Sequence, residues 1–99
     1  MAKESNVVYI GRKPPMAYVL AVLTSFSDTN TPEVLLKARG KAITTAVDVA
    51  EITKRRFIKE LTVDNISIGT EQLEQHEGGT RAVSTIEITL KNPSAAAKD

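Results

Sequence analysis

The sequence predicts an α/β (α+β) two-layer sandwich of order β-α-β-α-β-β, with two helices on a four-stranded mixed sheet. Three observations indicate this fold. The 99 residues, 41% of them hydrophobic, suit a single hydrophobic core. Short β-branched runs alternate with longer apolar stretches at helical spacing through the first 60 residues. The last third instead places apolar residues at every second position, which is typical of antiparallel strands.

The domain is expected to span residues 6–91. Residues 1–5 are predicted to form a flexible arm, because they contain no periodic apolar pattern. Residues 92–99, a short stretch of proline, alanine and polar residues, are predicted to form a flexible tail.

The first strand and the first helix follow from local composition. Residues 7–10 are β-branched and aromatic and are followed by Gly11, so they predict a strand. The Pro14-Pro15 pair opens a helix, because proline fits the first helical turn. Residues 27–32 form a polar turn cluster that is expected to end this helix at Phe26. The predicted apolar face consists of Met16, Val19, Leu20, Leu23 and Phe26.

A second strand and helix repeat this pattern. Residues 33–38 contain a run that is apolar on both faces, as in a buried parallel strand. After Gly40, a second helix is expected over residues 41–59, with a favourable pair between Glu51 and Arg55. Ile43, Val47, Ala50 and Phe57 mark one face of this helix. Phe57 is either a core residue or an exposed aromatic for contact with a partner, and periodicity does not distinguish the two.

The last third predicts a long hairpin that projects from the body. Residues 61–63 and 66–68 alternate in opposite phase, so a bulge is expected at Asp64-Asn65. Residues 83–90 alternate with a period of two, and Gly78-Gly79 marks the turn between the two strands.

The charge is nearly balanced but is distributed unevenly. The formal net charge of +1 excludes a histone-like tail protein. Residues 1–59 carry ten basic and five acidic residues, whereas residues 60–99 carry three basic and seven acidic ones. This asymmetry indicates contact with an anion such as nucleic acid, unless the two halves mix in space.

Several classes of protein are excluded. The longest apolar run has eight residues, 16–23, and a membrane span needs about 20. There is no cysteine and no secretory signal, so a soluble cytoplasmic protein is expected. His76 is the only histidine, and neither a phosphate-binding loop nor a dinucleotide motif occurs, so no metal, cofactor or catalytic residue is predicted.

The informative charges occupy two consecutive strand-to-helix turns. In a right-handed crossover both turns lie at the same end of the sheet. Neither predicted helix has an acidic residue in its first turn, so the cations face the positive end of each helix dipole. Free N–H groups, glycines and these cations together predict a phosphate site; the alternative is a solvated loop that only aids solubility. The five cations are Arg12, Lys13, Lys37, Arg39 and Lys41.

Four segments in this order resemble the Alba family of archaeal chromatin proteins, over about residues 6–91. They are Asn6-Val7-Val8-Tyr9-Ile10-Gly11-Arg12-Lys13-Pro14, then Lys37-Ala38-Arg39-Gly40-Lys41-Ala42-Ile43, then Ala46-Val47-Asp48 with Ala50-Glu51-Ile52 and Arg56-Phe57, and finally Val83-Ser84-Thr85-Ile86-Glu87-Ile88. The resemblance implies a chromosome-associated homodimer that binds double-stranded DNA, and often RNA, with little sequence preference.

The resemblance also implies roles for individual residues. Lys13 corresponds to a principal backbone contact and to the family's acetylation target, which implies an acetylase and a deacetylase as partners. Phe57 corresponds to an aromatic position in dimer–dimer contacts along DNA. The other basic positions of the family's binding face correspond to Arg12, Lys37, Arg39 and Lys41.

One segment departs from the family pattern. Family members usually place Arg or Lys on the hairpin arms that follow the minor groove. Here the arm from residue 70 to 81 carries three glutamates, and Arg81 is its only certain cation. We therefore expect a shorter or weaker footprint on DNA, centred on the two turns.

The leading hypothesis is a non-enzymatic protein that coats and compacts double-stranded DNA through phosphate contacts. The main alternative is an RNA-binding protein, either an RNA chaperone or a ribonucleoprotein subunit, that uses the same basic face. An enzyme acting on a phosphorylated ligand would need a nucleophile, base or metal that the sequence does not supply. A pure interaction module, using the broad apolar helix and Phe57, is the remaining alternative.

Overall fold

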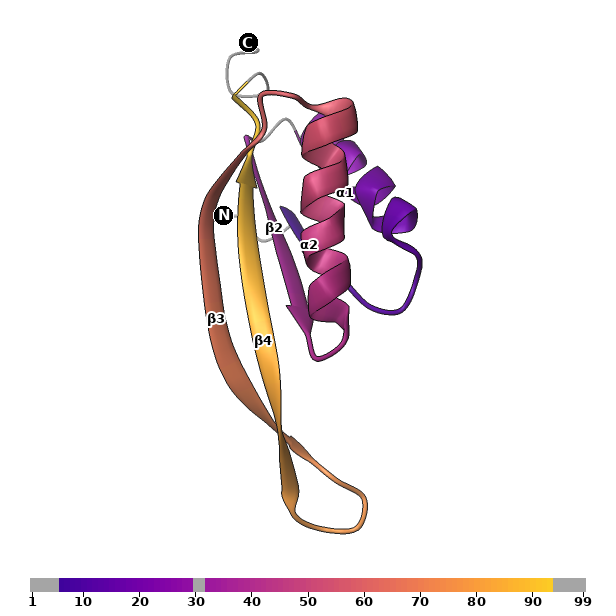
Figure 1. Cartoon of the computed structure of the whole chain (residues 1–99), viewed down its shortest axis with the longest axis vertical. Helices are drawn as coiled ribbons and strands as arrows, with labels where there is room; N and C mark the ends of the chain where they lie inside the picture. The colour runs from indigo at the N-terminus through magenta and orange to yellow at the C-terminus, as the bar shows by residue number, and fades with distance from the viewer. Residues whose placement is uncertain (1–5, 30–31, 94–99) are drawn as a thin grey trace.

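The computed structural model describes residues 6–29 and 32–93. The predicted arm at residues 1–5 and most of the predicted tail, residues 94–99, lie outside the described residues. The order of elements confirms the prediction (Figure 1). The elements are β1 (Val7–Tyr9), α1 (Pro15–Thr29), β2 (Glu33–Arg39), α2 (Ala42–Ile52), the π-helical turn η2 (Thr53–Phe57), β3 (Thr62–Glu74) and β4 (Thr80–Lys91).

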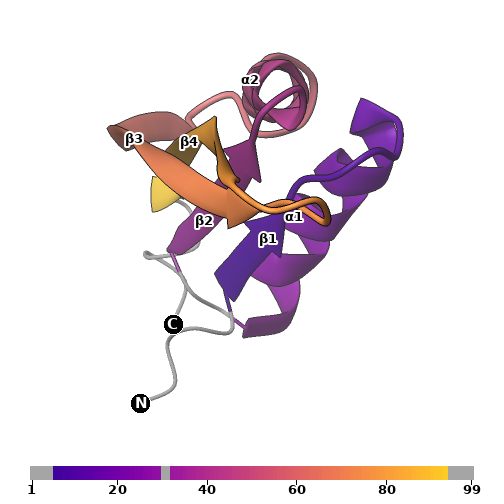
Figure 2. The same cartoon turned by 90° about the horizontal axis from the view of Figure 1, so that it is seen from below.

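The four strands form one mixed sheet of order β1-β2-β4-β3. β1 runs parallel to β2, whereas β4 is antiparallel to both β2 and β3. Both helices cover the same face of this sheet, as the two orthogonal views show (Figures 1 and 2). The other face is open, which leaves alternate residues of every strand available for function.

The core lies between the helices and the sheet. Val34 and Leu36 of β2 pair in register with Leu90 and Ile88 of β4, and all four are buried. Alternation then places Lys37 and Arg39 on the open face, because side chains of successive strand residues point to opposite faces. The hydrophobic pattern of β2 therefore fixes the side of the molecule on which its cations lie.

The predicted core faces of the two helices were partly wrong. In α1, Tyr18 and Val22 are buried beside Val19 and Phe26, whereas the predicted core residues Met16 and Leu20 are exposed. In α2, the buried residues are Ala46, Val49 and Ala50, whereas the predicted core residue Val47 is exposed. Phe57, at the end of η2, is also exposed, which is the second of the two alternatives left open for it. The buried face of α2 thus combines two alanines with Val49, whereas that of α1 carries the aromatic residues Tyr18 and Phe26.

Both helices end at positions other than those predicted. α1 continues through Ser27 to Thr29, since serine, aspartate and threonine each carry only a small helix penalty, less than about 0.7 kcal/mol. The second helix changes to a π-helical turn after Ile52. In that turn the Ile58 N–H donates to the Thr53 carbonyl at 2.8 Å, and the Thr53 hydroxyl donates to the Val49 carbonyl at 2.8 Å.

The hairpin is built as predicted. The register between β3 and β4 shifts between Val63 and Asn65, which confirms the bulge. Gly78 and Gly79 have φ values of 90° and 81°, a backbone conformation that only glycine adopts readily. The hairpin extends beyond the helices, so the longest dimension of the molecule is 53 Å (Figure 1).

The ordered body reaches past the end of β4. Asn92 is buried, and its N–H donates to the Pro32 carbonyl at 2.8 Å. This bond joins the segment after β4 to the segment that precedes β2.

Candidate nucleic-acid interface

The two cationic turns leave the same end of the sheet. Tyr9 of β1 lies opposite Lys37 of β2 in the parallel register, and the Ile10 N–H donates to the Lys37 carbonyl at 2.9 Å. Beyond these contacts, β1 continues into Arg12 and Lys13, and β2 continues through a turn into Lys41. Parallel pairing thus brings together segments that lie almost 30 residues apart in the sequence.

The first turn is held by a tyrosine from the helix that follows it. The hydroxyl oxygen of Tyr18, on α1, accepts hydrogen bonds from the N–H groups of Gly11 and Lys13, at 2.9 and 3.0 Å. The expectation that these backbone groups are free to bind an anion is therefore wrong for Gly11 and Lys13. The side chains of Arg12 and Lys13 remain exposed, so they are the groups of this turn that can meet a phosphate.

The second turn depends on a glycine in the left-handed region. Gly40 has a φ of 58°, and its N–H donates to the Ser84 carbonyl of β4 at 2.9 Å. Lys41 follows as the N-cap of α2, and neither α1 nor α2 has an acidic residue in its first turn. A cation at this position is opposed by the helix dipole, at a cost of about 0.3–1 kcal/mol, and an external anion would offset that cost.

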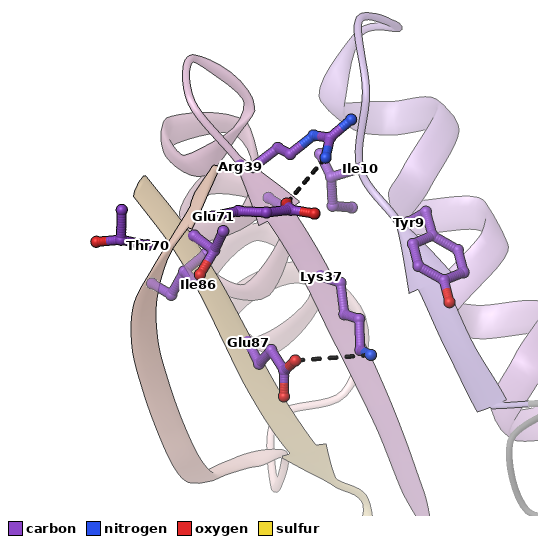
Figure 3. A pocket seen from close by; sticks show the side chains of 10 residues that line it. Tyr9, Ile10, Lys37, Arg39, Thr70, Glu71, Ile86 and Glu87 are labelled. Carbon is purple, nitrogen blue, oxygen red and sulfur yellow. Dashed lines mark hydrogen bonds and ion pairs between the residues drawn. The ribbon is translucent and has the colours of Figure 1, made fainter. Parts of the chain in front are cut away.

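The two cations of β2 interact with the chain's own carboxylates. Arg39 Nη1 lies 2.9 Å from Glu71 Oε1 of β3, and Lys37 Nζ lies 3.6 Å from Glu87 Oε2 of β4 (Figure 3). Both pairs are substantially exposed, so each contributes about 1 kcal/mol or less and exchanges readily for another partner. Lys37 and Arg39 are thus part of the interface but carry compensated charge.

Among the described residues, Arg12, Lys13 and Lys41 differ from Lys37 and Arg39, because they have no carboxylate partner of this kind. Within the described part of the chain, no ion pair joins Arg12, Lys13 or Lys41 to a carboxylate. These three side chains are exposed and supply the uncompensated positive charge at this end of the sheet.

The remaining predicted residues lie elsewhere. Arg81 is exposed on the projecting hairpin, opposite Leu73, and its neighbours on that arm include the exposed Glu74 and Glu77. Phe57 is 47% exposed at the end of η2, roughly 20 Å along the helix axis from Lys41. The structure therefore groups the five cations of the two turns but separates Arg81 and Phe57 from them.

Sequence reasoning missed two residues that shape this site, Tyr18 and Glu71, and one exposed residue that lies beside it, Tyr9. Tyr9 is 71% exposed on the open face and lies beside Lys37 (Figure 3); its aromatic ring in a strand next to a cationic turn was a signal. Tyr18 was missed because its place inside a predicted helix did not indicate that its hydroxyl would reach the N–H groups of the preceding turn. Glu71 was taken for a residue of the hairpin arm, since its contact with Arg39 spans 32 residues of sequence.

The described residues hold neither a candidate metal site nor a helix that could span a membrane. No group of three or more potential metal ligands occurs among them. No helix in residues 6–29 and 32–93 is both long and apolar enough to cross a bilayer.

Fold and site together define a small two-layer α/β protein with a cationic sheet end. The profile of the Alba family matches residues 6–70. A protein of Picrophilus torridus named DNA/RNA-binding protein Alba is 51% identical over 87 residues, which cover 88% of this chain and 96% of the relative. DNA/RNA-binding protein Alba 1 of Archaeoglobus fulgidus is 55% identical over 85 residues, which cover 86% of this chain and 93% of the relative.

A solved structure agrees with these sequences. Alba from Thermoplasma volcanium superposes with a TM-score of 0.80 at 48% identity, covering 87% of this chain and 99% of that one. The chain therefore belongs to the Alba family, which confirms the resemblance seen in its sequence.

Proposed function

We propose that this protein binds double-stranded DNA without sequence preference and coats it, as a non-enzymatic chromatin protein. The observation that carries the proposal is the set of exposed cations without carboxylate partners, Arg12, Lys13 and Lys41, on two turns at one end of the sheet. Phosphate contacts carry no base information, so such a surface binds any sequence. The relatives named DNA/RNA-binding protein support the binding of nucleic acid.

A homodimer is part of the proposal. β3 is an edge strand, and its Ile66 and Ile68 lie opposite the core-side residues Ile88 and Ile86 of β4, yet they are 56% and 81% exposed. An apolar strip on an unpaired edge is a site for association. A second copy of the chain that covers this strip would double the cationic surface and offset the small net charge of each protomer.

Two finer features of the proposed function involve Lys13 and Phe57. We propose that acetylation of the exposed Lys13 by an acetylase, reversed by a deacetylase, weakens binding by removing one positive charge. The exposed Phe57 is proposed as a contact between neighbouring dimers on DNA. We further propose that the protein is associated with the chromosome in the cytoplasm.

Replacing Lys13 tests the main proposal. Lys13→Gln should weaken binding to a short duplex about ten- to fiftyfold at low salt, because each dimer loses two phosphate contacts. The slope of log affinity against log salt should fall by roughly 1.8. The measurement is fluorescence anisotropy across a salt series. Lys59→Gln is the matched control, because it removes one exposed charge beyond the other end of the second helix.

Two results would contradict the proposal. One is an affinity of the Lys13→Gln protein equal to the parent at every salt concentration. The other is an equal loss in the Lys59→Gln control, which would show that total charge, rather than this turn, determines binding.

Removing the Glu71 carboxylate should have the opposite effect. Glu71→Gln frees the Arg39 guanidinium for a phosphate, so duplex affinity should rise about two- to fivefold at low salt, and the gain should shrink as salt screens the charges. Glu51→Gln is a close control: its carboxylate pairs with Arg55 at 3.1 Å and is 52% exposed, against 49% for Glu71. A gain of the same size in both variants would show a general charge effect instead.

RNA binding through the same surface is the second candidate. The cations of the two turns contact phosphates, which both nucleic acids offer, and the relatives' names include both. Competition between a structured RNA and a duplex DNA of equal length for the parent protein separates the two. A preference of tenfold or more for the RNA would favour an RNA chaperone or a ribonucleoprotein subunit.

A further inference from the structure

A hollow on the open face of the sheet lies next to the cationic turns but differs from them in chemistry. It is lined by the carboxyl ends of β1 and β2 and by the base of the hairpin (Figure 3). The side chains that matter for its chemistry are Tyr9, Lys37, Arg39, Thr70, Glu71 and Glu87.

Tyr9 is an aromatic side chain that the fold itself does not use. The preceding residue, Val8, and the following one, Ile10, are buried in the core on the other face, whereas Tyr9 is 71% exposed. Its ring stands beside Lys37, its partner in the parallel register (Figure 3). A rigid strand thus presents an aromatic face to solvent at the edge of a polar hollow.

The charges in the hollow are balanced. Lys37 is compensated by Glu87, and Arg39 is compensated by Glu71. A phosphate would gain little here, because two carboxylates repel it. A nucleobase is neutral and planar: it stacks on an aromatic ring, and its polar edge meets both hydrogen-bond donors and acceptors. This hollow therefore suits a base better than a phosphate.

The neighbouring turns place cations beside the hollow, where the phosphates next to a bound base would lie. Tyr9 is followed within four residues by Arg12 and Lys13, and Arg39 is followed by Lys41. A single strand with one base on Tyr9 would have its adjacent phosphates near these cations. In a duplex the bases are paired and stacked, so their faces cannot reach the ring.

We propose that this hollow is a binding site for an unpaired nucleobase, so that the protein holds single-stranded segments of nucleic acid by stacking a base on Tyr9. The inference rests on the proposed binding of nucleic acid and adds a second mode to it: phosphate contacts serve duplexes and single strands alike, whereas the Tyr9 site serves single strands only.

Two variants of Tyr9 test the site. Tyr9→Leu keeps an apolar strand residue but removes the ring, and Tyr9→Phe keeps the ring. The probes are labelled single strands of oligouridine and oligothymidine of about 12 nucleotides, and a duplex of the same length. We expect Tyr9→Leu to weaken both single strands at least about fivefold and to change duplex affinity by less than about twofold. Tyr9→Phe should bind all three probes as the parent does.

Photocrosslinking provides an independent readout. A single strand carrying one 5-iodouridine should crosslink to the peptide that contains Tyr9 in the parent, as mapped by mass spectrometry, and the yield should collapse in Tyr9→Leu. Circular dichroism and thermal unfolding check that both variants fold, which the exposure of the side chain favours.

The outcomes separate this inference from the function on which it rests. Suppose that Lys13→Gln weakens duplex binding. If Tyr9→Leu then leaves single-strand binding unchanged, or weakens duplex binding as much as single-strand binding, only the base site is overturned. Crosslinks confined to other peptides would also overturn it. If the parent binds no nucleic acid at physiological salt, both proposals fall together.

Discussion

An Ile68→Glu protein is expected to fold normally but to sediment as a monomer. The side chain is 81% exposed in the single chain, so a glutamate there costs the protomer little. In a symmetric dimer the substitution occurs twice and places two like charges in an apolar contact. Because an uncompensated buried charge costs about 3–5 kcal/mol, the dimer dissociation constant should rise at least about 100-fold. Analytical ultracentrifugation over a concentration series measures this constant.

The loss of the dimer should also reduce the affinity for DNA. Two linked cationic surfaces bind with an avidity that exceeds either surface alone by about 10²–10⁴. We therefore expect Ile68→Glu to weaken duplex binding by at least about 100-fold, although Ile68 makes no phosphate contact in the proposal. The effect should exceed that of Lys13→Gln, which leaves the dimer intact.

Leu20→Glu controls for the introduction of a charge. Leu20 is a large apolar residue on α1 that is 63% exposed, and α1 does not border the β3 edge. This variant should remain dimeric and should bind DNA nearly as the parent does. A monomeric Leu20→Glu protein, or a dimeric Ile68→Glu protein, would place the dimer contact on another surface.

The sequence predicts what local patterns encode. Period-two alternation gave the strands of the hairpin, the change of phase at Asp64-Asn65 gave the bulge, and Gly78-Gly79 gave the turn. Each of these features depends on neighbours within a few residues, so a single sequence suffices to predict it.

Features that depend on tertiary pairing could not be predicted in this way. Arg39 meets Glu71 only because β4 lies between β2 and β3 in the sheet, a register that no local pattern specifies. The convergence of the two turns was predicted, since it requires only a parallel crossover. The pairing of Lys37 and Arg39 with carboxylates was not predicted. It divides the predicted cation cluster into three cations on the turns, unpaired within the described residues, and a hollow in which the charges are balanced.

The buried faces of the helices are a second feature that the sequence pattern did not predict fully. Ala46 and Ala50 are buried although Val47 is the larger hydrophobic residue. Which face a helix buries depends on how closely it approaches its partners, and small residues permit the closest approach. The π-helical turn at Thr53 also changes the direction of Phe57, because the extra residue in the turn rotates every side chain that follows.

The Tyr18 hydroxyl connects the fold to the proposed function, and its removal should affect both. Tyr18→Phe leaves the N–H groups of Gly11 and Lys13 without the acceptor that lies 2.9 and 3.0 Å away. Losing a shared acceptor in this partly buried position should lower the free energy of unfolding by about 1–3 kcal/mol, measured by urea titration. It should also loosen the turn that carries Arg12 and Lys13, so duplex affinity should fall several-fold. Tyr9→Phe removes an exposed hydroxyl and should leave stability unchanged.

Hydrogen exchange locates the effect of Tyr18→Phe. In the parent, the amides of Gly11 and Lys13 should exchange slowly for a surface turn, because both are bonded to one buried tyrosine. In the variant these two amides should exchange at least about tenfold faster, while amides in the centre of β2 should change only as far as global stability does. Unchanged exchange at Gly11 and Lys13 would show that the proline pair and the core, rather than the hydroxyl, hold the turn in place. The Tyr18 hydroxyl would then have no part in positioning Lys13 for contact with a phosphate.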